Sequence, residues 1–207
     1  MNIHTDTVKQ GRKHAQVLDG ARTVFLRDGF EGASVDDIAR SARVSKATLY
    51  SYFPDKRILF MEVAKNECLA QEAATDEMIA MSAPPREALK RAALRMMKLF
   101  LSPFGRNVFR VCVAESERFP GLGKEFWESG PARTRLKMIA YFNQAIERGE
   151  LIIDDCDLAA DQFIELCKAD LFPKLMFGMQ DSFSEDEIER VANGAVATFM
   201  ARYGAKP

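Results

Sequence analysis

A short segment of cationic and hydroxyl-bearing residues, Ser45 to Tyr52, has the composition of a surface that binds nucleic acid. Lysine and hydroxyl side chains can reach phosphates and base edges, and the small Ala47 allows a helix to approach a DNA major groove closely. The same residues could also form the ordinary polar surface of a three-helix unit, which their spacing alone does not exclude. The segment is therefore a candidate recognition helix. Its polar members are Lys46, Thr48, Tyr50, Ser51 and Tyr52.

Local signals predict a first short helix before this segment. Ser34 is a favourable N-cap, and Asp37 follows it in capping-box register, with a charge that favours a helix N-terminus. The small apolar face of this helix comprises Val35, Ile38, Ala39 and Ala42.

Further signals delimit the recognition helix and begin the next one. Arg43 and Val44 form the predicted turn, and Ser45 caps the recognition helix. Pro54 ends it, because proline disfavours helical geometry at the preceding residue. Asp55 can cap a following helix whose first residue, Lys56, could hold a neighbouring phosphate.

A longer motif in this region resembles that of a known family. The run Val44-Ser45-x-x-x-Leu49-Tyr50-x-Tyr52-Phe53-x-x-Lys56, preceded by Asp37-Ile38-Ala39, resembles the helix-turn-helix signature of TetR-type transcriptional regulators. Residues from Lys9 to Leu69 can be laid on the DNA-binding domain of that family. The predicted DNA-binding residues are Arg12, Lys13, Ser34, Ser45, Lys46, Ala47, Thr48, Tyr50, Ser51, Tyr52 and Lys56.

The chain departs from the family pattern at one position of the turn. The family commonly has glycine where this chain has Arg43. A residue other than glycine must tolerate a left-handed or strained conformation there, at a cost of order 1 kcal/mol. We therefore expect a strained turn at Arg43.

Composition and charge fit a soluble DNA-binding protein. The chain has 207 residues, of which 47% are hydrophobic and 29% charged. Residues 1–60 contain ten Lys and Arg against seven Asp and Glu, whereas the remainder contains nineteen against twenty-three. A basic N-terminal region on an acidic body is the asymmetry expected of a small DNA-contacting region. No apolar run is long enough for a membrane span and the N-terminus is polar, so a cytoplasmic location is expected.

Cysteine and histidine give no sign of metal or cofactor chemistry. The four cysteines, Cys68, Cys112, Cys156 and Cys167, are widely spaced in apolar surroundings, so reduced buried thiols are expected; a redox role is the alternative. The two histidines, His4 and His14, lie in no ligand cluster. We expect neither a metal nor a cofactor.

Helical periodicity along the whole chain predicts an all-α fold of about nine helices. The expected domains are a flexible N-terminal arm at residues 1–10, a helix-turn-helix DNA-binding domain at 11–56 that extends to about 69, and a helical effector-binding and dimerisation domain at 70–207. One helix is expected from Lys56 to about Met81. Another, over residues 158–177, is expected to be kinked near Ala169 by Pro173.

Aromatic and methionine residues of the second domain could line a pocket for an apolar or aromatic effector. The alternative for each of them is a place in the ordinary core. The candidates are Met96, Met97, Phe100, Phe104, Phe109, Cys112, Trp127, Met138, Tyr141, Phe142, Phe163 and Cys167.

The last two predicted helices are candidates for a dimer interface. A helix that is apolar all round needs more cover than one chain of this size readily provides, and small side chains permit close helix packing. The TetR resemblance also implies a four-helix interface. The candidate interface residues are Phe163, Leu171, Leu175, Val191, Ala192, Ala195 and Phe199.

Together these features predict a homodimeric, sequence-specific DNA-binding regulator that is released from a palindromic operator by a small effector. A helical enzyme is one alternative, although the sequence has no G-x-S-x-G, H-E-x-x-H or phosphate-binding glycine loop. An interaction module with a vestigial DNA-binding head is the other. Binding to a short palindrome separates the regulator from both alternatives.

Overall fold

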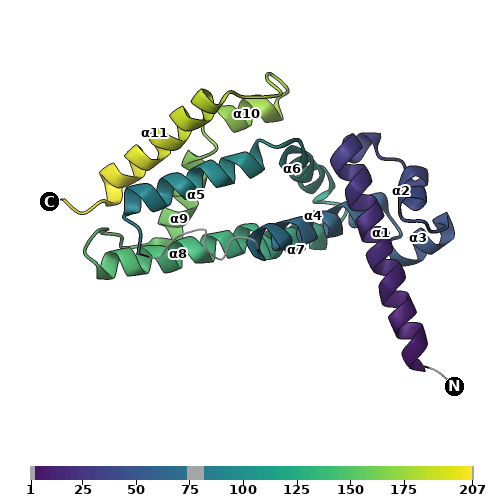
Figure 1. Cartoon of the computed structure of the whole chain (residues 1–207). Helices are drawn as coiled ribbons and strands as arrows, with labels where there is room; N and C mark the ends of the chain where they lie inside the picture. The colour runs from purple at the N-terminus through teal and green to yellow at the C-terminus, as the bar shows by residue number, and fades with distance from the viewer. Residues whose placement is uncertain (1–2, 74–81, 207) are drawn as a thin grey trace. The chain divides into compact units, whose positions relative to one another are not determined.

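The computed structural model describes residues 3–73 and 82–206, which form eleven α-helices (Figure 1). Within these residues the only extended pairing is one isolated antiparallel bridge between Leu151 and Gly204. The predicted all-α fold with a helix-turn-helix is therefore confirmed, with eleven helices in place of about nine. In the same residues, no helix combines the length and apolarity needed to cross a membrane.

Contacts between residues group the chain into two compact units. The head unit comprises Met1–Ala70 and Asn107–Phe126, and the body unit comprises Gln71–Arg106 and Trp127–Pro207. Two segments far apart in sequence thus share the head unit. The division into domains near residue 70 stays a prediction.

The first helix, α1 (Ile3–Gly32), is longer than the sequence predicts. Residues 3–10, expected to be a flexible arm, form its first turns. The helix is kinked at Gly29, where the backbone takes φ 71° and ψ −178°, a conformation that favours glycine. Beyond the kink, the Phe30 ring packs against those of Phe25 and Phe60, at 6.2 and 5.0 Å between ring centroids, which anchors the chain as it enters the next helix.

Three shorter helices complete the N-terminal part of the head unit: α2 (Val35–Ser41), α3 (Lys46–Tyr52) and α4 (Lys56–Ala73). Helix α1 packs closely on α2, because Gly20 has no side chain: a Cβ atom there would lie 2.5 Å from the backbone nitrogen of Ala42. The predicted continuation of α4 to Met81 lies outside the described residues.

Each of the next four helices begins with a proline. They are α5 (Pro85–Phe100), α6 (Pro103–Glu115), α7 (Pro120–Ser129) and α8 (Pro131–Glu147). Proline suits the first helical turn because the N–H group that it lacks would have no partner inside the helix.

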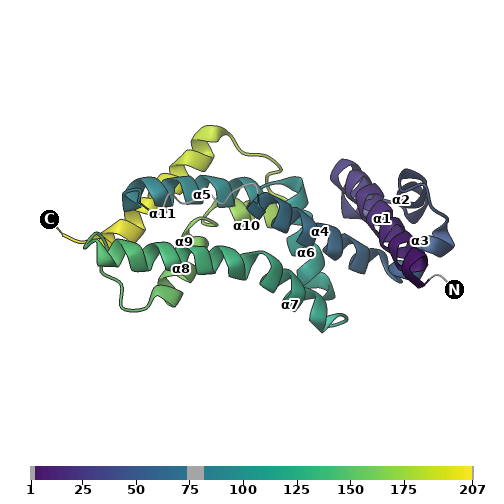
Figure 2. The ribbon, with the colours of Figure 1, turned by 60° about the horizontal axis from the view of Figure 1, so that its bottom comes forward.

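Three helices follow in the body unit: α9 (Cys156–Leu166), α10 (Leu171–Met176) and α11 (Glu185–Tyr203). Helix α11 packs on α5 and α9, and α9 packs on α8 (Figure 2). Aromatic rings join these helices at the centre, where Phe199 lies 5.2 Å from Phe142 and 5.3 Å from Phe163 between centroids.

The prediction of a single kinked helix over residues 158–177 is wrong, because the structure has two separate helices there, α9 and α10. Asp170 takes a left-handed φ of 65° between the two helices. Pro173 then falls in the first turn of α10, where its missing N–H costs little. Pro173 therefore lies near the start of a separate helix and does not bend a continuous one.

The C-terminus is tied to the loop between α8 and α9. The Ile152 amide donates to the Tyr203 carbonyl at 2.8 Å, and the Ala205 amide donates to the Glu150 carbonyl at 3.0 Å. These bonds flank the bridge between Leu151 and Gly204 and hold the end of α11 against the body core.

Candidate nucleic-acid interface

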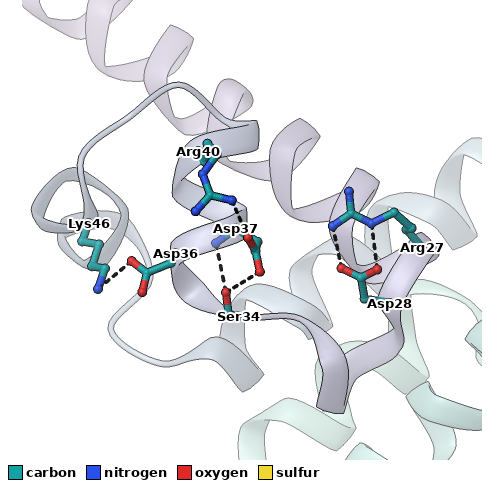
Figure 3. Close-up of polar contacts among 7 residues, drawn as sticks. All are labelled: Arg27, Asp28, Ser34, Asp36, Asp37, Arg40 and Lys46. Atoms are coloured by element: carbon teal, nitrogen blue, oxygen red, sulfur yellow. Dashed lines mark hydrogen bonds and ion pairs between the residues drawn. The ribbon is translucent and has the colours of Figure 1, made fainter.

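Helix α2 begins with the predicted Ser34 cap (Figure 3). The Asp37 amide donates to Ser34 Oγ at 3.0 Å, and Ser34 Oγ in turn donates to the Asp37 carboxylate at 2.6 Å. Arg40 donates to the same carboxylate at 2.7 Å. These two partners, Ser34 first and then Arg40, hold the pKa of Asp37 below its usual value. The Ser34 hydroxyl, predicted to contact DNA, is thus already engaged within the helix.

The turn between α2 and α3 has the strained geometry that the sequence predicts. Arg43 takes a left-handed φ of 54°. Its amide donates to the Arg40 carbonyl at 3.1 Å, and the Val44 amide donates to the Ala39 carbonyl at 3.0 Å. Two backbone hydrogen bonds therefore close the turn by joining it to the last residues of α2.

Helix α3 presents a polar face and buries its apolar one. Ser45 caps it by accepting from the Thr48 amide at 3.1 Å, and Leu49 and Phe53 are buried in the head unit. Thr48 is half-buried, and its hydroxyl lies 2.9 Å from Ser45 Oγ. Tyr50 is 46% exposed. The exposed residues of the helix, which we call the recognition face, are Lys46, Ala47, Tyr50 and Ser51.

Tyr52 faces away from this surface toward α1. It is half-buried, with its ring 5.7 Å from that of His14 in an edge-on arrangement. His14 also packs at 5.1 Å from the Phe53 ring. Tyr52 and His14 thus join the recognition helix to α1, a role that the predicted DNA contact at Tyr52 did not anticipate.

The recognition face carries an internal ion pair that the sequence did not reveal. Lys46 Nζ lies 2.6 Å from the Asp36 carboxylate on α2, as Figure 3 shows. The hydrogen bond to Asp36 and its negative charge raise the pKa of Lys46. The side chains are 55% and 58% exposed, so the pair is screened by solvent and can open when a phosphate approaches.

This ion pair gives a testable effect on DNA affinity. Asp36→Asn should raise affinity roughly two- to fivefold, because it frees Lys46 and removes a negative charge near the phosphates. Lys46→Gln should lower affinity and reduce the slope of log K against log salt by about 0.9 per protomer. Salt titrations by fluorescence anisotropy measure both effects. Weaker binding by Asp36→Asn would contradict this arrangement.

Lys56 serves the fold of the head unit. Its ammonium group donates to the carbonyls of Phe30 and Ala33, at 2.9 and 3.1 Å, and lies 4.4 Å from the centroid of the Phe30 ring. These contacts fix the connection between α1 and α2 against the start of α4. The sequence predicts a phosphate contact for Lys56, but most of its hydrogen-bonding capacity is used inside the protein.

Lys56→Met therefore tests a structural role against a phosphate contact. The variant leaves two carbonyl groups without their donor, which should lower the free energy of unfolding by about 1–3 kcal/mol. The salt slope of DNA binding should stay that of the wild type. Lys13→Met, on the exposed side of α1, is the matched control and should change stability by less than about 0.5 kcal/mol. An unchanged thermal midpoint with a reduced salt slope would reassign Lys56 to the DNA.

Arg12 and Lys13 are exposed on α1 and make no hydrogen bond or ion pair with the described part of the chain. Because α1 begins at Ile3, the two residues lie well inside the helix and not at its start. A contact from these side chains to phosphate remains a prediction.

The start of α4 is capped as predicted. The Arg57 amide donates to Asp55 Oδ1 at 2.8 Å, and the Arg57 guanidinium holds the pKa of Asp55 below its usual value. The same guanidinium donates to Glu115 on α6 at 2.9 Å. Arg57 thus joins the two sequence segments of the head unit.

The predicted effector residues divide between the two units. Phe109 and Cys112 belong to the head unit, and the other ten belong to the body unit. In the body unit, most of them pack in the core with Phe142 and Phe163, whereas Trp127 is 52% exposed. Tyr141 donates its hydroxyl to the Ala83 carbonyl at 2.7 Å, and burial raises its pKa.

Neither hollow in the head unit is formed by these residues. One, of about 30 Å³, lies between α4 and α7, and the other, of about 100 Å³, lies between α1 and α4. Both are far below the ~300 Å³ lower bound of typical ligand pockets. An effector site at the predicted residues therefore stays a prediction.

The predicted dimer residues are placed inside the protomer. All seven are buried in the isolated chain, and Phe163, Ala192 and Phe199 are almost fully inaccessible. Because the rest of the same chain covers these side chains, a second protomer cannot contact them. Their apolar character is accounted for by packing within one chain, such as that of α11 on α5 and α9, and a dimer interface stays a prediction.

Cys156 and Cys167 are thiols of low reactivity that form no disulfide. Burial raises the pKa of Cys167 to about 12, and burial with the nearby Asp157 raises the pKa of Cys156. Because the thiolate is the reactive form, these two thiols are poor nucleophiles at neutral pH. In the described residues, no three His, Cys, Asp or Glu side chains gather as a metal site requires.

A helix-turn-helix head joined to an all-helical body defines a class of DNA-binding regulator, and known proteins identify the family. Residues 17–63 match the family described as "Bacterial regulatory proteins, tetR family". Residues 87–205 match the "AefR-like transcriptional repressor, C-terminal domain". The chain therefore belongs to the TetR family of transcriptional regulators, with a body of the AefR-like type. The family is one of regulators and not of enzymes, which sets aside the helical enzyme.

Similar solved structures cover nearly the whole chain. A putative TetR-family regulator from Mesorhizobium loti MAFF303099 is 27% identical, over 94% of this chain and 98% of that one, with a TM-score of 0.76. The flavonoid-responsive regulator FrrA is 32% identical, over 95% of this chain and 100% of that one, with a TM-score of 0.72.

One curated relative matches this chain over only part of the relative's own length. The negative regulator IcaR of the Staphylococcus aureus biofilm operon icaADBC is 36% identical over 50 residues, which are 24% of this chain and 27% of IcaR. The match spans about a quarter of that protein.

Proposed function

We propose that this chain is a cytoplasmic, homodimeric transcriptional repressor that binds a palindromic operator and leaves it when a small aromatic effector binds. The observation that carries the proposal is the recognition face of α3, defined above, which offers a cation and hydroxyl groups around the small Ala47. Such a surface can enter a major groove, with Lys46 directed to phosphate and Tyr50 to bases or methyl groups. Its position in a helix-turn-helix of TetR type supports this use.

Two heads are needed because one short recognition helix reads too few base pairs for specificity. A twofold dimer presents two such helices to half-sites that lie ~34–36 Å apart, one turn of the DNA. The palindrome and the dimer are thus parts of one proposal. An effector acts by binding more tightly to a head spacing that does not fit this distance.

The exposed face of α11 is the surface proposed for dimerisation, in place of the buried residues. Asn193, Ala197 and Ala201 follow one another at four-residue spacing, with Gly194 beside them, and all four are exposed. Residues at this spacing form one ridge of a helix, and small side chains allow a second helix to approach to about 8–10 Å. Pairing of this face with its twofold mate explains an exposed ridge of such small residues.

The effector class is proposed from chemistry and from one relative. The body unit is rich in aromatic and methionine side chains, which suit a flat apolar ligand. FrrA, 32% identical, is described as flavonoid-responsive. We therefore favour an aromatic, phenol-like effector, for which Trp127 is an accessible candidate contact in the body unit.

Selection of bound fragments from the source genome tests the proposal. The full-length protein should enrich one or a few short inverted repeats at about 0.15 M salt, and flavonoids added to the recovered complex should release the DNA. Enrichment of no common sequence would contradict the operator and favour an interaction module with a vestigial head. Enrichment without release by any aromatic compound would contradict only the effector class.

A further inference from the structure

The turn of the helix-turn-helix holds an arginine in a conformation that suits glycine. Arg43 has φ 54°, in the left-handed region that glycine adopts without strain and other residues rarely adopt. The backbone around it is fixed by hydrogen bonds from its own amide to Arg40 and from Val44 to Ala39. A chain that keeps a long cationic side chain here retains strain that glycine would relieve.

The Arg43 guanidinium has no ion-pair or hydrogen-bond partner in the described part of the chain, whereas the nearby cationic side chains have partners. Arg40 pairs with Asp37, Lys46 pairs with Asp36, and Lys56 donates to two carbonyl groups. The Arg43 side chain is exposed and makes no hydrogen bond or ion pair within residues 3–73 and 82–206. The strain is therefore not offset by any side-chain contact inside the described protein.

We infer that Arg43 binds a DNA phosphate beside the recognition helix and adds one charged contact per protomer that a glycine at this position could not make. The inference rests on the proposed DNA-binding function. Arg43 lies two residues before the Ser45 cap, so its anchor is next to the N-terminal end of α3. A guanidinium matches a phosphate with two parallel hydrogen bonds, and such contacts fix the register of a recognition helix on the duplex.

Salt titration of four proteins tests this contact. Wild type, Arg43→Gly, Arg43→Gln and Arg43→Lys are titrated with the duplex recovered by genomic selection and with a random duplex of equal length. Lys46→Gln is the positive control, and Arg86→Gln, an exposed arginine of the body unit, is the matched negative control. Thermal unfolding of each variant is measured in parallel.

We expect Arg43→Gly and Arg43→Gln to reduce the salt slope by about 0.9 per protomer, or about 1.8 for a dimer, on both duplexes. A doubling of salt should then weaken the wild type about 3.5-fold more than either variant. Arg43→Lys should keep the slope. Arg43→Gly should unfold at the same or a higher temperature than wild type, so that its weaker binding has no origin in stability.

Two results are decisive against the inference, and they differ from failure of the function. Wild-type affinity and slope in Arg43→Gln, with both reduced in Lys46→Gln, would overturn the phosphate contact and leave the DNA-binding function standing. A lower unfolding temperature in Arg43→Gly would overturn the account of strain. Absence of wild-type binding to any duplex would instead contradict the proposed function itself.

Discussion

Ala195→Glu is expected to prevent the protein from folding. Ala195 is 3% exposed on the side of α11 that packs in the body core. An uncompensated buried charge costs about 3–5 kcal/mol, and the larger side chain adds about 1–3 kcal/mol of overpacking. The sum is comparable with the ~5–15 kcal/mol by which a typical domain is stable. Circular dichroism and gel filtration should show unfolded or aggregated protein.

Ala197→Glu is the matched control, because it places the same charge two residues away on the exposed face of α11. This variant should fold with a thermal midpoint close to that of the wild type. If the proposed dimer surface is correct, two carboxylates then meet near the twofold axis and the dimer dissociates. A folded Ala195→Glu dimer would contradict the packing of α11, whereas a dimeric Ala197→Glu would move the interface elsewhere.

Phe163→Ala is expected to be the second most damaging change. The Phe163 side chain is 0% exposed, and its ring meets that of Phe199 edge-on. Truncation of a buried phenylalanine costs about 3–5 kcal/mol, because the cavity closes only in part. At about 2–4 °C per kcal/mol for a protein of this size, the thermal midpoint should fall by roughly 6–20 °C.

Trp127→Ala is the comparison for Phe163→Ala. Because Trp127 is half-exposed, its truncation should change the midpoint far less. A change in effector response can therefore be interpreted at Trp127, while at Phe163 it is confounded by lost stability. A midpoint for Phe163→Ala within 2 °C of wild type would show that this core is wrongly assigned.

The helix-turn-helix could be predicted from the sequence because its signals are local. The caps at Ser34 and Ser45 each bond an amide three residues ahead, and the strain at Arg43 belongs to a single residue. Pro173 was a weaker signal. It indicated a disturbance in the helix, but a kink and a break differ only in the conformation of Asp170, which no local preference specified.

The roles of individual charges could not be predicted, because their partners are distant in sequence. Lys46 is ten residues from Asp36, and Lys56 is 23 and 26 residues from the carbonyls that it bonds. Only the packing of α1, α2, α3 and α4 brings these groups together. A lysine at a surface motif is typical of phosphate binding, but the same residue type also serves to hold loops.

The proposed interface illustrates a related limit. Apolar periodicity identified the buried side of α11, yet a core and an obligate interface have the same composition. Only the burial of Val191, Ala195 and Phe199 within one protomer distinguishes the two. The exposed ridge of small residues on the opposite side gives a weak hydrophobic signal, so apolar periodicity did not indicate it as a candidate interface.

The central claim, that two recognition faces read one palindrome, is tested most directly by titrating the recovered operator with wild-type protein at about 0.15 M salt. Sedimentation and anisotropy should show two protomers per inverted repeat, or a multiple of two. Affinity should exceed that for a random duplex by about 10³-fold or more, and scrambling either half-site should remove most of this difference. One protomer per duplex, or equal affinity for the operator and random DNA, would contradict the account.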